Sequence, residues 1–158
     1  MKMTNGWLKE IGACRDGVEW FNNQKETDGT KVIKKLIKED RIDWANWTIC
    51  RMFSKKQKIQ YAVYAAEQVI DIFEKKYPDD KRPRKAIEAA KKCIENDTEE
   101  NRSAAESAAS AESARSAASA ASAWSAAWGA RSAASAWGAR RKKMQLKILK
   151  YGISLLKT

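Results

Sequence analysis

Apolar residues recur along the chain at the spacing of α-helices. The clearest stripe has a 4-3-4-3-4 spacing and contains Ile59, Val63, Ala66, Ile70, Phe73 and Tyr77. It predicts one helix from about residue 55 to residue 77. Ser54 followed by Gln57 is a capping-box pattern at the start of this helix, and Pro78 ends it.

A second helix is expected after the loop that follows Pro78. Pro83 suits the first turn of a helix, because the N–H that proline lacks would be unpaired there. From Pro83 onward, Ile87, Ala90 and Ile94 share one helical face. This spacing predicts that the second helix packs through that face.

Shorter apolar segments predict further helices. Upstream they lie at 7–11, 18–21, 31–38 and 43–51, and Asp43 is placed to cap the last one. Downstream, a 3-4-3 spacing relates Leu146, Leu149, Ile153 and Leu156. No run alternates with the period of two that marks a β-strand. The pattern predicts an all-α fold, a single-domain helical bundle of about six to eight helices.

Residues 103–139 form a low-complexity tract with 18 Ala and 10 Ser. Ala is the strongest helix former, so we expect a long helix that begins with Asp97 as its cap and Glu100 three residues later. Gly129 and Gly138 are the natural break points, and the break is expected near 129. A disordered linker is the alternative. A helix of this length is also a surface through which two copies of the chain could associate.

The expected organisation is therefore one helical domain over 1–158. It has mixed-charge helices at 1–97, the Ala/Ser/Trp-rich helix at 98–139 and a basic C-terminal helix at 140–158. The net charge is +11, from 31 Lys+Arg and 20 Asp+Glu. The last acidic residue is Glu112, and nine bases follow it without an acid. The charge favours a negatively charged partner.

The composition excludes several kinds of site. The chain has no histidine, which excludes Ser-His-Asp and Cys-His nucleophiles and every His-containing metal site. Cys14, Cys50 and Cys93 are far apart and form no CxxC motif, so we expect a reducing cytoplasm and no zinc site. No Gly-rich phosphate loop and no membrane-spanning run is present. We expect no catalytic residue, no metal and no cofactor.

Candidate ligand-binding residues are arginines and aromatic residues. Arg82 and Arg84 present two guanidinium groups at a helix N-terminus, where they can bind phosphate or pair with Asp79, Asp80 or Glu88. Aromatic rings can stack on a nucleobase or belong to the core; the candidates are Trp20, Trp44, Trp47, Tyr61, Tyr64, Trp124 and Trp128. Those assigned to the site are Trp44, Trp47, Tyr64, Trp124 and Trp128. Arginines in helical register with aromatic residues can complete an anion pocket; these are Arg51, Arg115 and Arg131.

Three segments carry a family resemblance. They contain Cys-Arg-Asp-Gly-Val-Glu-Trp at 14–20, Asp-Trp-Ala-Asn-Trp at 43–47 and Asp-Lys-Arg-Pro-Arg-Lys-Ala-Ile at 80–87. With the Ala-rich stretch and the Tyr151-Gly152 helix, they resemble the small helical "putative immunity proteins" found near bacterial toxin systems and in bacteriophage genomes. The resemblance implies an all-α, non-enzymatic protein, but it does not fix the target.

Four hypotheses on function follow. The first is a phage counter-defence protein in the host cytoplasm that sequesters an anionic nucleotide signal in an Arg/Trp-lined pocket. The alternative is an immunity protein that binds and inhibits a toxin. A nucleic-acid-binding protein is a further alternative, based on the basic run Arg140–Lys143. An enzyme that degrades such a signal is the fourth.

Overall fold

The computed structural model describes residues 1–101, 103 and 134–157. Within these residues the chain forms α-helices and no β-strand, and one isolated β-bridge joins Lys2 to Asp28. The all-α prediction is therefore confirmed. The chain divides into two compact units, unit 1 (Met1–Ser54 and Gln145–Thr158) and unit 2 (Lys55–Met144).

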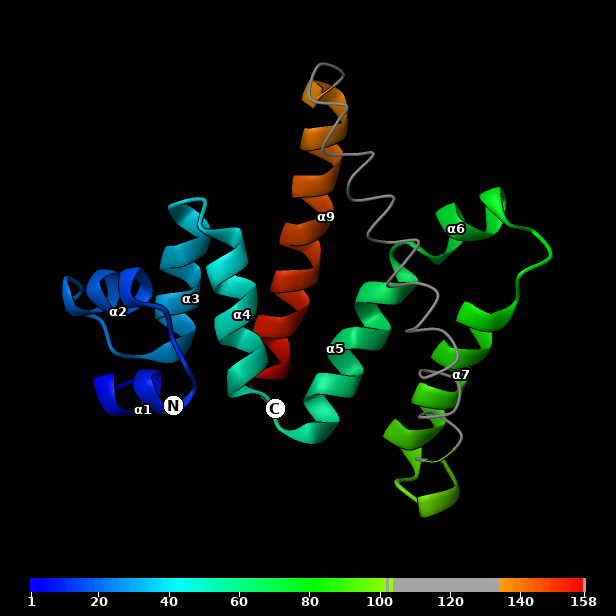
Figure 1. The fold of residues 1–158 in the computed structure, drawn as a ribbon, viewed down its shortest axis with the longest axis horizontal. Helices are drawn as coiled ribbons and strands as arrows, with labels where there is room; N and C mark the ends of the chain where they lie inside the picture. The colour runs from blue at the N-terminus through cyan, green and yellow to red at the C-terminus, as the bar shows by residue number, and fades with distance from the viewer. Residues whose placement is uncertain (102, 104–133, 158) are drawn as a thin grey trace. The chain divides into compact units, whose positions relative to one another are not determined.

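Unit 1 contains four helices from the beginning of the chain and the end of α9. The four are α1 (Asn5–Glu10), α2 (Arg15–Asn22), α3 (Gly29–Lys38) and α4 (Ile42–Met52), and α9 is Ala134–Leu155. Figure 1 shows α3 and α4 side by side. The end of α9 in unit 1 begins at Gln145.

Local signals in the sequence set the starts of these helices. Thr4 caps α1, its Oγ1 accepting the Trp7 N–H at 3.1 Å, and Asp28 caps α3 in the same way. The prediction that Asp43 caps α4 is wrong: Arg41 occupies the N-cap position, and Asp43 lies inside the first turn. A negative side chain in the first turn is still favourable, because it faces the positive end of the helix dipole.

The core of unit 1 combines α3, α4 and the end of α9. Ile33 and Ile49 are 0% exposed, and Leu149 is 1% exposed. Val32 and Leu36 complete the buried face of α3. Leu149 and Ile153 belong to the predicted C-terminal stripe, and both are buried. The 3-4-3 spacing therefore identified the face of α9 that packs into the core of unit 1.

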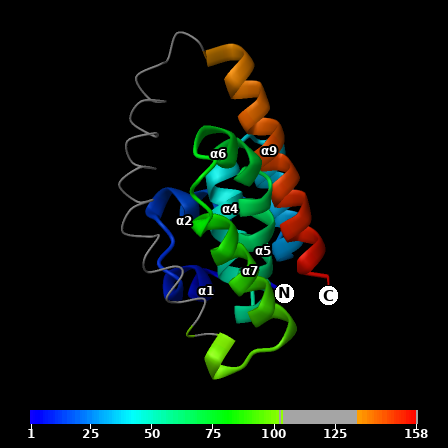
Figure 2. The same ribbon diagram turned by 90° about the vertical axis from the view of Figure 1, so that its right-hand side faces the viewer.

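Unit 2 contains α5 (Lys55–Glu67), α6 (Ile70–Lys76) and α7 (Arg82–Glu95), and α5 lies beside α7 in Figures 1 and 2. The prediction of one helix from 55 to 77 is wrong, because two helices occupy this range. The end of α5 tightens through bonds from Gln68 N to Ala65 O and from Val69 N to Ala66 O. Val69 then leaves the helical region, and Ile70 turns into the core.

Ion pairs connect α7 to the other two helices of unit 2. Lys91 Nζ lies 2.6 Å from Glu67 Oε1 of α5, and Arg84 pairs with Glu74 of α6. Pro83 occupies the first turn of α7, as predicted. An apolar groove of about 690 Å³ lies among the three helices.

Two helices start at other residues than the sequence predicted: the helix near residue 100 and the C-terminal helix α9. Thr98, one residue after the predicted cap, accepts the N–H of Asn101 through its side chain. Gly138 lies within α9, so the helix does not break there and begins before residue 140. Most of the predicted Ala/Ser helix, with its break near Gly129, lies outside the described residues. Within the described part, no helix is both long and apolar enough to cross a bilayer.

Candidate functional site

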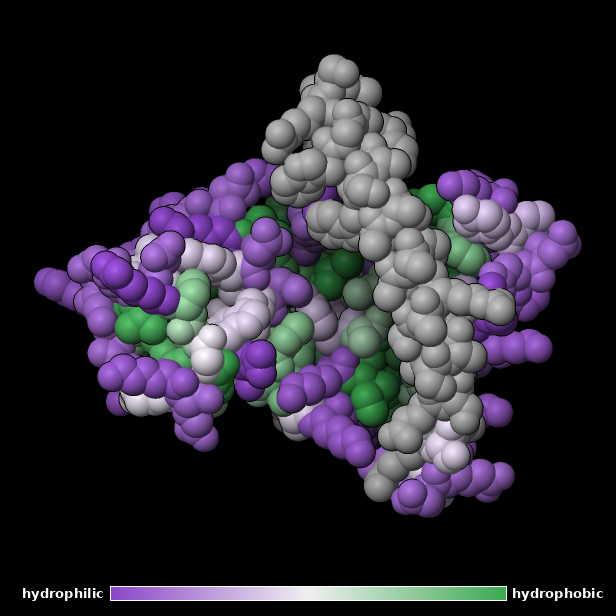
Figure 3. Space-filling view, in the orientation of Figure 1, coloured by the Kyte–Doolittle hydropathy of each residue, from purple (hydrophilic) through white to green (hydrophobic). Residues whose placement is uncertain are grey.

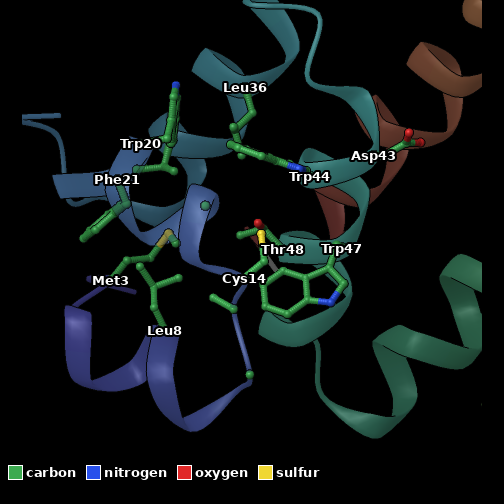
Figure 4. Close-up of a pocket in the computed structure, with 14 residues that line it drawn as sticks. Met3, Leu8, Cys14, Trp20, Phe21, Leu36, Asp43, Trp44, Trp47 and Thr48 are labelled. Atoms are coloured by element: carbon green, nitrogen blue, oxygen red, sulfur yellow. The ribbon is translucent and has the colours of Figure 1, made fainter. Parts of the chain in front are cut away.

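An aromatic pocket of about 340 Å³ opens in unit 1 (Figure 4). It lies between the turn that joins α1 to α2 and the exposed face of α4. Its lining is mostly apolar and consists of Met3, Leu8, Gly12, Ala13, Cys14, Gly17, Trp20, Phe21, Val32, Leu36, Asp43, Trp44, Trp47 and Thr48. Figure 3 shows hydrophobic side chains gathered over α1–α3 at the left of the view, bordered by hydrophilic ones.

Backbone conformation opens the pocket on the side of α1. Gly12 ends the turn after α1 with φ of +74°, in the left-handed region that a side chain rarely adopts. No atom lies within 4 Å of the place where its Cβ would be. The positive φ angle therefore favours glycine at position 12, whereas the space around it would admit a side chain.

Trp20 and Trp44, which line the pocket, belong to a closed ring of four interacting side chains that Glu39 and Arg41 complete. Trp20 meets Trp44 edge-on, with centroids 6.4 Å apart and an interplanar angle of 77°. Trp20 Nε1 donates to Glu39 Oε2 at 2.7 Å, and Glu39 pairs with Arg41 at 3.6 Å. The Arg41 guanidinium lies 4.4 Å from the Trp44 ring centroid, which closes the ring. Both indoles are thus held in place before any ligand arrives.

The lower wall is formed by Trp47, which carries its own arginine. The Arg51 guanidinium lies 5.3 Å from the centroid of the Trp47 ring, and Arg51 is exposed. The two residues are one turn apart on α4. Arg51 thus lies near an aromatic ring, as its register indicated, and its part in an anion pocket stays a prediction.

Thr48 is the polar group inside this pocket. The residue is 5% exposed and belongs to the described lining. Figure 4 shows its hydroxyl near the middle of the labelled side chains. Asp43 is the one charged residue in the described lining, and its carboxylate points away from that middle (Figure 4).

Arg82 and Arg84 lie in unit 2 at the start of α7, and both are paired with carboxylates. Arg82 Nε donates to Asp80 Oδ1 at 2.8 Å, with a second bond from Nη2 to Oδ2. Arg84 makes a bidentate pair with Glu74, with both N···O distances 2.6 Å, and lies 3.6 Å from Asp71. The pair of Arg82 with Asp80 is one of the ion pairs that the sequence offered as the alternative to phosphate binding. The pair of Arg84 with Glu74 was not expected from the sequence.

The pair on α6 and α7 shifts the ionisation of both groups. The hydrogen bond from Arg84 is the largest cause that holds the pKa of Glu74 below its ordinary 4.5. The same bond raises the pKa of Arg84. Both groups are therefore more firmly charged than in a free chain.

The structure thus brings three of the candidate residues together, Trp44, Trp47 and Arg51 on α4. Arg82 and Arg84 belong to the other unit, as does Tyr64, which is half-buried on α5. The remaining candidates lie outside the described residues: Arg115, Trp124, Trp128 and Arg131.

Sequence reasoning missed Thr48, and it named Trp20 as a possible stacking ring without assigning it to the site. A usable signal existed for Thr48, because it lies one helical turn after Trp44 and so shares its face. Trp20 reaches the pocket from α2, and no spacing rule relates it to α4. Its place follows only from the packing of the helices.

The arrangement is that of a binding pocket for an uncharged apolar or aromatic group. Over the part of the chain that is described, no cluster of three or more Cys, Asp or Glu is placed to hold a metal ion. The described lining offers ring faces, aliphatic groups, one hydroxyl and one free thiol, that of Cys14. These groups favour affinity and orientation of a ligand.

The fold and this pocket define an all-α protein with an apolar pocket lined by tryptophans. A family model described as "Imm-5 like putative immunity protein" matches residues 48–155, which is more than half of the chain. The chain belongs to this family, as the sequence resemblance predicted. A second model, "YdhT N-terminal domain", matches residues 1–57. No curated protein and no solved structure matches the chain.

Proposed function

We propose that this protein is a non-enzymatic immunity protein that binds a toxin protein through the aromatic pocket of unit 1. The observation that carries the proposal is membership of the Imm-5 like family, which favours the toxin-binding alternative over the nucleotide hypothesis. The pocket supplies a surface for such binding, because tryptophan and arginine dominate the energetic centres of protein interfaces. Trp47 with Arg51 at its rim is such a combination.

Preorganisation supports the same function. Trp20, Glu39, Arg41 and Trp44 are already held by one another in the free protein. Binding therefore costs little ordering of these side chains, and fixed side chains bind more tightly for the same contact area. An inhibitor that must act quickly on a toxin gains from such a surface.

The test is binding to purified toxins encoded beside the gene for this protein. A Trp47→Ala variant should bind at least about 30-fold more weakly, since truncating a central tryptophan typically costs at least 2 kcal/mol. Ile72→Ala is the matched control, because Ile72 is a large exposed side chain (59%) outside the pocket. Affinity is measured by calorimetry and protection by growth of cells that express the toxin. Equal loss in both variants, or none in Trp47→Ala, contradicts the use of this pocket.

Sequestration of a nucleotide signal, in phage counter-defence, stays a prediction. Arg82 and Arg84 already pair with carboxylates, and no positively charged residue is in the described lining of the pocket. These contacts place nucleotide binding second. Calorimetry with cyclic dinucleotides and ADP-ribose derivatives tests it, and release of intact ligand after denaturation distinguishes sequestration from degradation.

A further inference from the structure

A second surface of unit 1 combines α3 with the end of α9, which is drawn in red in Figure 1. It contains a slot of about 250 Å³ lined by Lys34, Ile37, Leu146, Lys150 and Ile153. We infer that this lysine slot binds an acidic amphipathic segment of a partner protein. The apolar side chains of the segment enter the slot, and its carboxylates pair with the lysines. The surface goes beyond the proposed function, because it shares no described lining residue with the aromatic pocket.

The positive charge of the slot is not neutralised by the part of the protein that is described. Lys34 and Lys150 are exposed, and neither makes an ion pair within these residues. The same is true of Lys38, one turn after Lys34, and of Lys147, one turn before Lys150. The sequence of α9 contains no acidic residue. The surface therefore carries uncompensated positive charge, which favours a partner with carboxylates.

Carboxylates next to α3 in the sequence are engaged by other groups. Glu26 pairs with Lys31 at 3.4 Å, and Asp28 accepts the backbone N–H of Lys31 as the cap of the helix. At the other end of α3, Glu39 pairs with Arg41 at 3.6 Å. These contacts leave the lysines of the slot to an external partner.

The other three lining residues of the slot are apolar. Ile37 and Leu146 are half-buried, and Ile153 is buried. The volume of the slot lies below the roughly 300 to 1,000 Å³ of pockets for small molecules, so it suits a few side chains and not a whole cofactor. An apolar slot bordered by cations matches the recognition mode in which an amphipathic helix lays its apolar face into a groove. Apolar contact then supplies affinity, and the charges orient the partner.

Nucleic acids and anionic membranes fit this surface less well. The described lining offers no aromatic side chain on which a nucleobase could stack. A membrane surface requires apolar side chains that insert into the lipid. The large exposed apolar side chains among the described residues are Met1, Val69, Ile72 and Tyr77, and none of them belongs to α3 or α9. Half-buried apolar groups between lysines therefore favour a protein segment.

The experiment measures binding of fluorescent peptides of about 18 residues, or about five helical turns, to the full chain by anisotropy. The first peptide consists of Glu, Ala and Leu, with the leucines along one helical face. The second has the same composition in a shuffled order and no apolar face. The first should bind about three- to tenfold more tightly, because only its leucines can enter the slot together. A third peptide, with Gln in place of Glu, should bind more weakly than the first.

Charge reversal in the slot tests the same contacts from the side of the protein. Lys34→Glu and Lys150→Glu should each lower the affinity for the amphipathic peptide about five- to tenfold, since each replaces an attraction with a repulsion. Lys9→Glu is the matched control, because Lys9 is exposed on α1 outside the described lining and the change in net charge is the same. It should alter the affinity by less than about twofold, since salt screens distant charges. Circular dichroism checks that the three variants are folded.

Equal binding of the ordered and shuffled peptides overturns the assignment, and so does an equal loss of affinity in all three variants. The competing probes are a duplex DNA of about 20 base pairs and vesicles that contain phosphatidylserine. Tighter binding of either probe than of the amphipathic peptide would show that the surface recognises a nucleic acid or a membrane and not a protein segment.

These outcomes are separate from those of the toxin test. The peptide titration needs no toxin, so loss of toxin binding with an intact preference for the amphipathic peptide overturns the proposed function and not the lysine slot. Toxin binding without that preference overturns the lysine slot and leaves the proposed function standing.

Discussion

At the scale of single residues, the pocket depends on side chains that interact before a ligand is present. The bond from Trp20 Nε1 to Glu39 and the contact of Arg41 with Trp44 restrict both indoles. Thr48, a residue that is 5% exposed, adds a hydroxyl to this mostly apolar lining.

At the scale of elements, unit 2 is held by ion pairs between helices that are separated in the sequence. Glu74 of α6 and Arg84 of α7 are ten residues apart and make two short bonds. Glu67 of α5 pairs with Lys91 of α7. These pairs fix α7 against both neighbours, in addition to the apolar groove among the three helices.

The Glu74 pair predicts a pH dependence. The pKa of Glu74 is lower in the folded protein than its ordinary 4.5, so the folded state binds fewer protons than the unfolded state. Its contribution to stability is present above about pH 4.5 and is lost as the pH falls through the folded pKa. Glu74→Gln should thus be less stable than the wild type at pH 7, and the two curves should converge in acid.

Thermal unfolding at several pH values between 3 and 7 measures this difference. Glu95→Gln removes an exposed carboxylate of α7 for which the described residues provide no ion pair, and it should follow the wild type throughout. A Glu74→Gln variant that stays parallel to the wild type down to acid pH would contradict the assignment.

Much of the fold was predictable from the sequence because its signals are local. The apolar stripes located the helices, and Pro83 marked the start of α7. The same stripe hid the break at Val69, since the apolar spacing continues across it while the backbone leaves the helical region. Trp44 and Trp47 were predictable in the site from their own spacing. Trp20 was a candidate stacking ring, but its position against Trp44 was not predictable, because packing between helices determines it.

At the scale of the whole molecule, unit 1 is built from two distant stretches of chain. Residues 1–54 combine with residues from 145 onward, and Leu149 and Ile153 are buried. The matched family boundaries differ from this division: one model ends at residue 57, and the other runs from 48 to 155. The segment matched by the first model therefore lacks part of its structural unit.

Leu149→Ala should lower the free energy of unfolding by about 2–5 kcal/mol, as for other fully buried leucines. Its side chain is 1% exposed. Lys147→Ala, an exposed change in the same part of α9, is the control and should stay within about 0.5 kcal/mol of the wild type. Denaturant unfolding measures both. A small effect of Leu149→Ala would show that α9 contributes little to unit 1.

The split composition of unit 1 also has a consequence for synthesis on the ribosome. The first 54 residues emerge early, but Leu149 and Ile153 emerge roughly ten seconds later at ordinary translation rates of about 5–20 residues per second. During that interval the nascent chain exposes the apolar faces that these residues later cover. Unit 1 can therefore complete its core only after residue 153 has been synthesised.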